Sequence, residues 1–281
     1  MERIAPSVYS YEKSATIEET TNRAAPNNNV PPTGENVIVP IIRKYGFITA
    51  PLIQRILNIY HHKTINALKS LIKLQQQGKV QKYTIKFPSD RQDIDVYILS
   101  PEMRMMSGQK SVFKYDMTDI PYILEHLAAS QWHISVLEGK NAKEVMLFKQ
   151  ISSNGFIAQL PSMIECKSKI GKKINLCALP VPKGVYKQDL GRLFTNVITI
   201  DSYLSERKDR FRAYVIVLIC ESQNQIDEVS RLLCEISETK DIYILYSVEL
   251  MSGDDEFDPL SILYDISRYD GELEQNVIKL R

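Results

Sequence analysis

The sequence has no aspartate or glutamate in residues 36–89. A segment without acids cannot neutralise its own bases, and this one contains nine: Arg43, Lys44, Arg55, Lys63, Lys69, Lys73, Lys79, Lys82 and Lys86. Residues 221–281 have the opposite bias, with fifteen acids and five bases. The formal net charge of +1 over 281 residues therefore hides a basic segment that suits a polyanion such as nucleic acid.

Other absences narrow the classes of protein that remain. The four cysteines include no CxxC pair, so no disulfide framework or zinc site is indicated. The first residues contain no signal-peptide run, and the longest apolar run, residues 213–220, is too short to cross a bilayer. We expect a cytoplasmic protein with no membrane partner. Because no GxxxxGK[ST], GxGxxG or GxSxG motif is present, we expect no cofactor.

Composition divides the chain into four parts, and the predicted fold class is α/β. Residues 1–35 are rich in small and polar residues and predict a disordered N-terminal arm. Residues 36–110 predict a winged helix-turn-helix, and residues 111–253 an α/β domain with a mixed central sheet. Residues 254–281 are predicted to form an acidic, polar tail.

The second part follows the order helix, helix, helix, strand, strand that is typical of a winged helix-turn-helix. Thr49 is a suitable N-cap for the second helix. The third helix is predicted from about His62 to Gln77, with Gly78 ending it. Alternating residues after Gly78 predict a hairpin with its turn at residues 89–92.

The residues expected to contact DNA are polar or basic and belong to the third helix and the hairpin. They are His62, Lys63, Asn66, Lys69, Ser70, Lys73, Lys82, Lys86 and Arg91. The lysines would bind phosphates, and Asn66 could pair with both groups of an adenine edge. Leu68 and Ile72 are expected to pack in the core. A solvated helix face and a protein-docking module are the alternatives to DNA binding.

No metal site is expected in this part, because the adjacent His61 and His62 have no third ligand nearby. From residue 111 the sequence predicts alternating helices and strands. The predicted helices are 111–130, 142–152, 186–208 and 225–237, and the predicted strands are 132–139, 160–166, 174–179, 213–222 and, as the last, 241–250.

Two of these strands resemble the metal-binding strands of PD-(D/E)xK nucleases. Pro161 is followed by Ser162, where such a nuclease carries its first acid. Ala178 and Pro180 stand at the acidic places of the next strand. Without two carboxylates, Mg²⁺ has little to hold it. We therefore expect a nuclease-like scaffold without nuclease activity, and an unrelated α/β domain is the alternative.

The order of elements resembles the replication-relaxation family of plasmids and integrative elements, over roughly residues 36–255. The stretches that carry the resemblance are FITAPLIQRIL, HHKTINALKSLIKLQQQGKV, YTIKF, WHISVLEG, LPSMIEC, INLCAL, GRLFTNVITIDSYL and AYVIVLICES. The resemblance implies a winged helix joined to a nuclease-like domain. It also implies a non-catalytic accessory factor that binds double-stranded DNA in plasmid replication or conjugative transfer. A relaxase or a replication initiator is the implied partner.

Three hypotheses therefore stand at the level of sequence. The first is this DNA-binding accessory protein, whose α/β domain forms a homodimer or recruits a replication or transfer protein. The second is a transcription regulator with the same winged helix and an α/β sensor or dimerisation domain. The third is a metal-dependent nuclease that uses Glu165 and Lys167.

Overall fold

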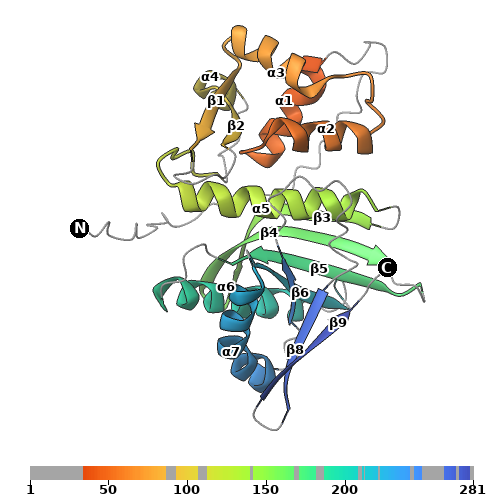
Figure 1. Ribbon diagram of the computed structural model, residues 1–281, viewed down its shortest axis with the longest axis vertical. Coiled ribbons are helices and arrows are strands. Elements are labelled where there is room, and N and C mark those ends of the chain that lie inside the picture. The colour runs from red at the N-terminus through yellow and green to blue at the C-terminus, as the bar shows by residue number, and fades with distance from the viewer. Residues whose placement is uncertain are drawn as a thin grey trace. The chain divides into compact units, whose positions relative to one another are not determined.

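The computed structural model is of the mixed α/β class (Figure 1). The residues that it describes are 34–86, 93–106, 113–139, 142–167, 171–181, 187–207, 211, 213–220, 222–240, 244–248, 263–269 and 272–278. Residues 1–33 of the predicted arm, the hairpin turn and Arg91 lie outside these ranges. Gly34 and Glu35, which were assigned to the arm, instead form the start of the first helix.

The N-terminal unit has the predicted order of three helices and a two-stranded antiparallel hairpin. Its elements are α1 (Gly34–Tyr45), α2 (Ala50–Ile59), α3 (Ala67–Gln76), β1 (Val80–Ile85) and β2 (Ile94–Leu99). Thr49 is confirmed as the N-cap of α2, since its side chain accepts a hydrogen bond from the Leu52 N–H at 3.4 Å. Gly78, with a φ of 69°, follows the end of α3 as predicted.

The predicted start of α3 at His62 is wrong, because the helix begins at Ala67. His61 adopts a left-handed φ of 62°, and the chain turns before Asn66, which is extended. The extended backbone of Asn66 is incompatible with a helix that runs on from residue 62. Leu71, which was predicted to pack on the first two helices, is fully buried.

Helix α5 (Ile120–Leu137) replaces the predicted strand at residues 132–139 and begins nine residues later than the helix predicted from residue 111. Twelve of its eighteen residues are buried. A helix that is buried around its circumference shows no amphipathic period, which explains why its C-terminal half was read as an alternating strand. None of the described helices, α5 included, is long and apolar enough to cross a membrane.

Strand β3 (Ala142–Ser153) occupies the segment that was predicted as a helix at residues 142–152. Among the described strands it lies at the edge of the sheet and pairs only with β4 (Phe156–Lys167). Its charged residues, such as the exposed Lys149, suit an edge strand and also gave it the appearance of a helix. Phe148, opposite Pro161 in this register, has a φ of 46°, which a bulky residue rarely adopts.

The main sheet is mixed, as predicted, and its seven strands follow one another in chain order. The remaining elements are α4 (Pro101–Met105), β5 (Lys173–Pro180), α6 (Lys187–Ser205), β6 (Tyr214–Cys220), α7 (Gln223–Lys240), β7 (Ile244–Val248), β8 (Leu263–Tyr269) and β9 (Glu272–Ile278). Strands β5, β6 and β7 are parallel, and the other pairings are antiparallel. Strands β8 and β9 continue the sheet, so residues 263–269 and 272–278 of the predicted acidic, polar tail form part of it.

Alternating side chains of the central strands divide between two faces of the sheet. On one face Leu176 and Val217 pack against Trp132 of α5. On the other face Cys177 and Ile216 pack in the core that includes residues of α6 and α7. The central strands therefore lie between helical layers, which accounts for their nearly continuous apolar sequence.

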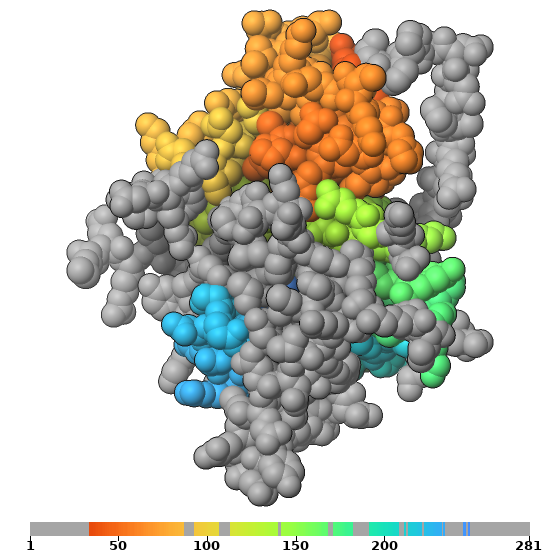
Figure 2. Space-filling model, turned by 45° about the vertical axis from the view of Figure 1, so that its right-hand side comes forward, coloured from red at the N-terminus to blue at the C-terminus, as the bar shows by residue number. Residues whose placement is uncertain are grey.

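The hydrophobic core of the N-terminal unit does not end at residue 110. Ile123, Leu124 and Leu127 of α5 belong to the same buried cluster as α1, α2, α3 and the hairpin. Figure 2 shows the surface of α5, in yellow-green, meeting that of the orange helices. Arg55 of α2 also forms an ion pair with Glu138 at 2.6 Å.

A substitution on α5 tests this shared core. Ile123→Ala should lower the free energy of unfolding by about 2–5 kcal/mol, because Ile123 is fully buried. We expect one cooperative transition in urea, followed by both tryptophan fluorescence and circular dichroism, to move as a whole. Ile120→Ala is the matched control, since Ile120 lies on the same helix and is 42% exposed. Two separate transitions, only one of them shifted, would contradict a shared core.

Candidate nucleic-acid interface

Acids from outside residues 36–89 neutralise four of the nine bases in that segment. The ion pairs are Lys44–Glu144, Arg55–Glu138, Lys79–Glu35 and Lys82–Asp95. Two of these acids, Glu138 at the C-cap of α5 and Glu144 of β3, are 83 and 100 residues along the chain from the bases that they pair. The basic surface of the N-terminal unit is therefore smaller than the sequence suggests.

The other five bases make no ion pair with any residue in the described part of the chain. They are Arg43, Lys63, Lys69, Lys73 and Lys86, and all five are exposed. Lys69 and Lys73 lie on α3, and Lys63 lies in the turn before it. The positive charge that remains is thus concentrated around α3.

The outward face of α3 follows from its buried face. Ala67, Leu71 and Leu74 point into the core, and at about 100° per residue the opposite direction falls between Ile72 and Lys69. Ile72 is 48% exposed and Leu68 is 52% exposed. The prediction that these two side chains pack in the core is therefore wrong, because the buried residues of α3 are Ala67, Leu71 and Leu74.

Two side-chain amides fix the start of α3. The Asn66 Oδ1 accepts a hydrogen bond from the Lys69 N–H at 2.8 Å, which makes Asn66 the N-cap. Gln54 of α2 accepts from the Ala67 N–H at 2.9 Å and donates to the Ile65 carbonyl at 3.3 Å. Sequence reasoning missed Gln54, since nothing in its position on α2 marks it as a partner of the next helix. The predicted two-bond contact of Asn66 with adenine would require the oxygen that caps α3.

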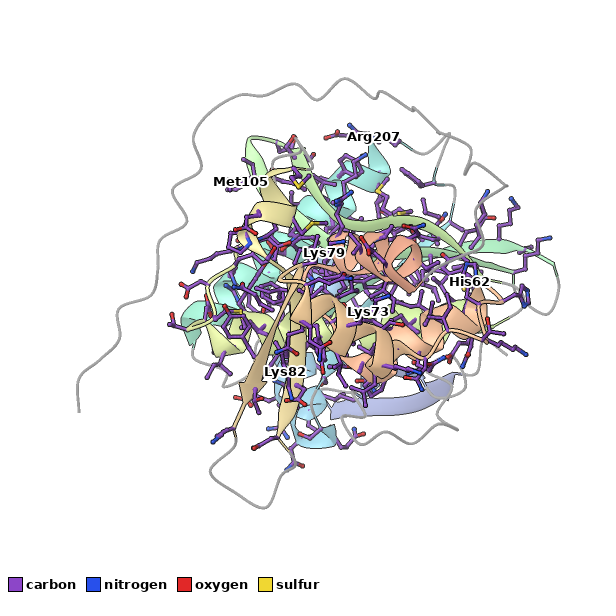
Figure 3. The ribbon with its side chains drawn as sticks, turned by 90° about the horizontal axis from the view of Figure 1, so that it is seen from above. His62, Lys73, Lys79, Lys82, Met105 and Arg207 are labelled. Carbon is purple, nitrogen blue, oxygen red and sulfur yellow. The ribbon has the colours of Figure 1, made fainter. Side chains whose placement is uncertain are left out.

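The other residues predicted to contact DNA differ in exposure and in their partners. Ser70 is half-buried and lies against Gly34 of α1, so it does not point outward. His62 lies in the turn before α3 and is also half-buried. Lys82 is paired with Asp95 across the hairpin at 2.7 Å, whereas Lys86 is exposed. In the view of Figure 3, His62 and Lys82 lie toward opposite sides of the unit, with Lys73 between them.

A second polar cluster joins α1 to the sheet and is centred on His133 of α5. The His133 Nε2 contacts Glu144 at 3.0 Å, and its Nδ1 contacts the Ser162 Oγ at 2.7 Å. Glu144 also receives a hydrogen bond from Lys44 at 2.6 Å. Burial alone would raise the pKa of Glu144, but His133 and Lys44 lower it to about 2. Because an ionised carboxylate only accepts, Nε2 carries the proton, and the Ser162 hydroxyl donates to Nδ1.

This cluster has the hydrogen-bond order serine, histidine, acid of a hydrolase triad. Ser162 and His133 are both fully buried, however. A nucleophilic serine must be reached by its substrate, and this oxygen cannot be reached in the described structure. The arrangement instead satisfies polar groups that would be costly to bury alone.

His126 lies about two helical turns before His133 on α5 and is part of an aromatic cluster. Its ring stacks on Phe148, with centroids 3.7 Å apart, and its Nε2–H donates to the Tyr45 carbonyl. Phe47 and Phe113 contact the ring edge-on. Burial lowers the pKa of His126 to about 3 and also lowers the pKa of His133. Both rings are therefore neutral in the folded protein at neutral pH.

The strands that resemble nuclease strands do not bring acids together. Glu165 of β4 forms an ion pair with Lys173 of β5 at 3.0 Å. Ser162 and Ala178 face each other in the register of β4 and β5. Within the described ranges no group of three or more His, Cys, Asp and Glu side chains could hold a metal ion.

Comparison of the chain with protein-family models, with curated proteins and with solved structures finds no match. The resemblance to the replication-relaxation family thus remains a prediction from its sequence stretches.

Substitution of Asn66 tests its role as a cap. Asn66→Ala should lower the free energy of unfolding by about 1 kcal/mol, because the Lys69 N–H loses its acceptor. Asn66→Ser keeps a capping oxygen and should stay close to the wild type. Urea denaturation measures both variants. Equal loss in the alanine and serine variants would show that the amide acts in some other way.

The buried histidines predict a stability that falls in mild acid. Near pH 6.5 the unfolded chain takes up protons on both rings while the folded protein does not. The stability is therefore complete above pH 6.5 and decreases below it, by up to about 1.4 kcal/mol per pH unit for each histidine. Urea denaturation between pH 7.5 and 5.5 measures this slope. His126→Gln should reduce the slope by about half, and an unchanged slope in this variant would contradict a buried, neutral His126 ring.

Proposed function

We propose that the protein binds double-stranded DNA through α3 and the β1–β2 hairpin, which act as a winged helix-turn-helix. The observation that carries the proposal is the exposed, unpaired positive charge of Lys63, Lys69 and Lys73 around one helix, within the described residues. Such lysines neutralise phosphates and release condensed counterions. Four of the other six bases are paired with acids, which leaves most of the unpaired charge at the helix that a winged helix-turn-helix inserts into the major groove.

The start of α3 supports the same proposal. Asn66 and Gln54 satisfy N–H groups of its first turn, so the helix is held without help from a ligand. Its N-terminal residues would enter the groove first in this type of docking. Exposed Lys86 on the hairpin would contact the sugar-phosphate backbone beside the groove.

We propose a non-catalytic role for the α/β part, as an accessory protein of plasmid or mobile-element replication or conjugative transfer. The buried Ser162 and the ion pair of Glu165 with Lys173 support this role. The resemblance to the replication-relaxation family suggests the biological setting. A nuclease-like ancestry of the sheet is part of the same proposal.

Fluorescence anisotropy of a labelled random-sequence duplex, titrated with protein at several salt concentrations, tests DNA binding. The double substitution Lys69→Ala and Lys73→Ala should weaken binding and reduce the slope of log K against log salt by about 2, because two phosphate contacts are lost.

Lys149→Ala with Lys167→Ala is the matched control. It removes the same charge from exposed positions on β3 and β4 and should bind like the wild type. If both double variants lose affinity equally, the effect is one of net charge and not of α3. Absence of binding at low salt by the wild type would overturn the proposed function.

A further inference from the structure

Two large apolar side chains lie exposed on the same side of α3 as the lysines. Leu68 and Ile72 are one helical turn apart and are about half exposed. At about 100° per residue, Leu68 and Ile72 form one edge of the outward face, and Lys69 and Lys73 form the other. Neither apolar side chain belongs to the buried core cluster of this unit.

This combination of charge and apolar surface limits the partner. The lysines favour a partner with negative charge close to the helix, and Leu68 and Ile72 favour apolar groups beside that charge. In the major groove of DNA the C5-methyl group of thymine is an apolar group that a side chain can reach, and it lies within reach of the phosphates. Charge complementarity therefore favours a thymine-containing duplex as the occupant.

We propose that Leu68 and Ile72 read thymine methyl groups, so that the protein prefers duplexes with thymine at two nearby positions. This inference rests on the proposed function. Residues four apart on a helix are separated by about 6 Å along its axis, which is close to the 6.8 Å or so of two base-pair steps on one strand. The preferred thymines should thus lie about two steps apart.

Replacing thymine by uracil removes the methyl group and leaves base pairing unchanged. The probes are labelled 20-base-pair duplexes of alternating dA-dT and alternating dA-dU, titrated with the full-length protein in anisotropy. In the first duplex each strand carries thymines two steps apart. We expect the wild type to bind the dA-dT duplex more tightly, by about fourfold for each methyl group contacted.

Two double variants separate the apolar contact from the charge. Leu68→Ala with Ile72→Ala should bind both duplexes alike, at about the wild-type affinity for dA-dU. Lys69→Ala with Lys73→Ala should weaken both duplexes by the same factor and keep the preference for thymine. Because all four side chains are exposed, circular dichroism should show the wild-type fold in each variant.

The outcomes distinguish this inference from the proposed function. If the wild type binds both duplexes equally with a clear salt dependence, thymine reading is overturned and DNA binding stands. If it binds neither duplex at low salt, the proposed function fails and this inference fails with it. A preference for thymine that survives in the Leu68→Ala, Ile72→Ala variant also overturns the assignment of these residues. The assignment would be supported if the wild type bound an alternating dG-dC duplex more tightly when its cytosines carry a 5-methyl group.

Discussion

The rest of the fold depends on the burial of α5 from two sides. Its side chains complete the core of α1–α3 and the hairpin through residues such as Ile123 and Leu127. On its other side Trp132 and Val136 cover the sheet. A helix in this position has little solvent-exposed surface, and twelve of its eighteen residues are buried, so its sequence is largely apolar. The position of α3 relative to the sheet follows from this helix, because α2 and α3 pack on the structure that α5 supports.

Polar contacts fix the relative orientation of α1, α5 and β3, which apolar packing alone would not determine. Glu144 of β3 binds Lys44 of α1 and His133 of α5 at once. His126 ties α5 to the Tyr45 carbonyl at the end of α1. Hydrogen bonds are directional whereas apolar contacts are not, so α1, α5 and β3 can satisfy these groups in few relative positions. Phe148 keeps an uncommon backbone conformation in this same region and stacks on His126.

Local signals made much of the fold predictable. The Thr49 cap, Gly78 and the apolar strands at residues 174–179 and 213–222 carry their structure within a few residues, and each lies where it was expected. The errors arose where distant packing decides. Residues 132–137 are helical because they have two cores to cover, and β3 is a strand because β4 pairs with it. At α3, Asn66 and Gln54 together set the first turn. The burial of Ala67, Leu71 and Leu74 leaves Leu68 and Ile72 exposed.

The four ion pairs of the N-terminal unit show that its surface charge depends on acids from other parts of the chain. Glu138 and Glu144 lie far from α3, yet they decide whether Arg55 and Lys44 count toward the surface potential. A change of either acid would add positive charge without altering any residue of α3. Electrostatic attraction can therefore be adjusted at two separate places, and a mutational scan would find that the acid at the C-cap of α5 and the acid of β3 change the potential around α3 through the bases that they pair.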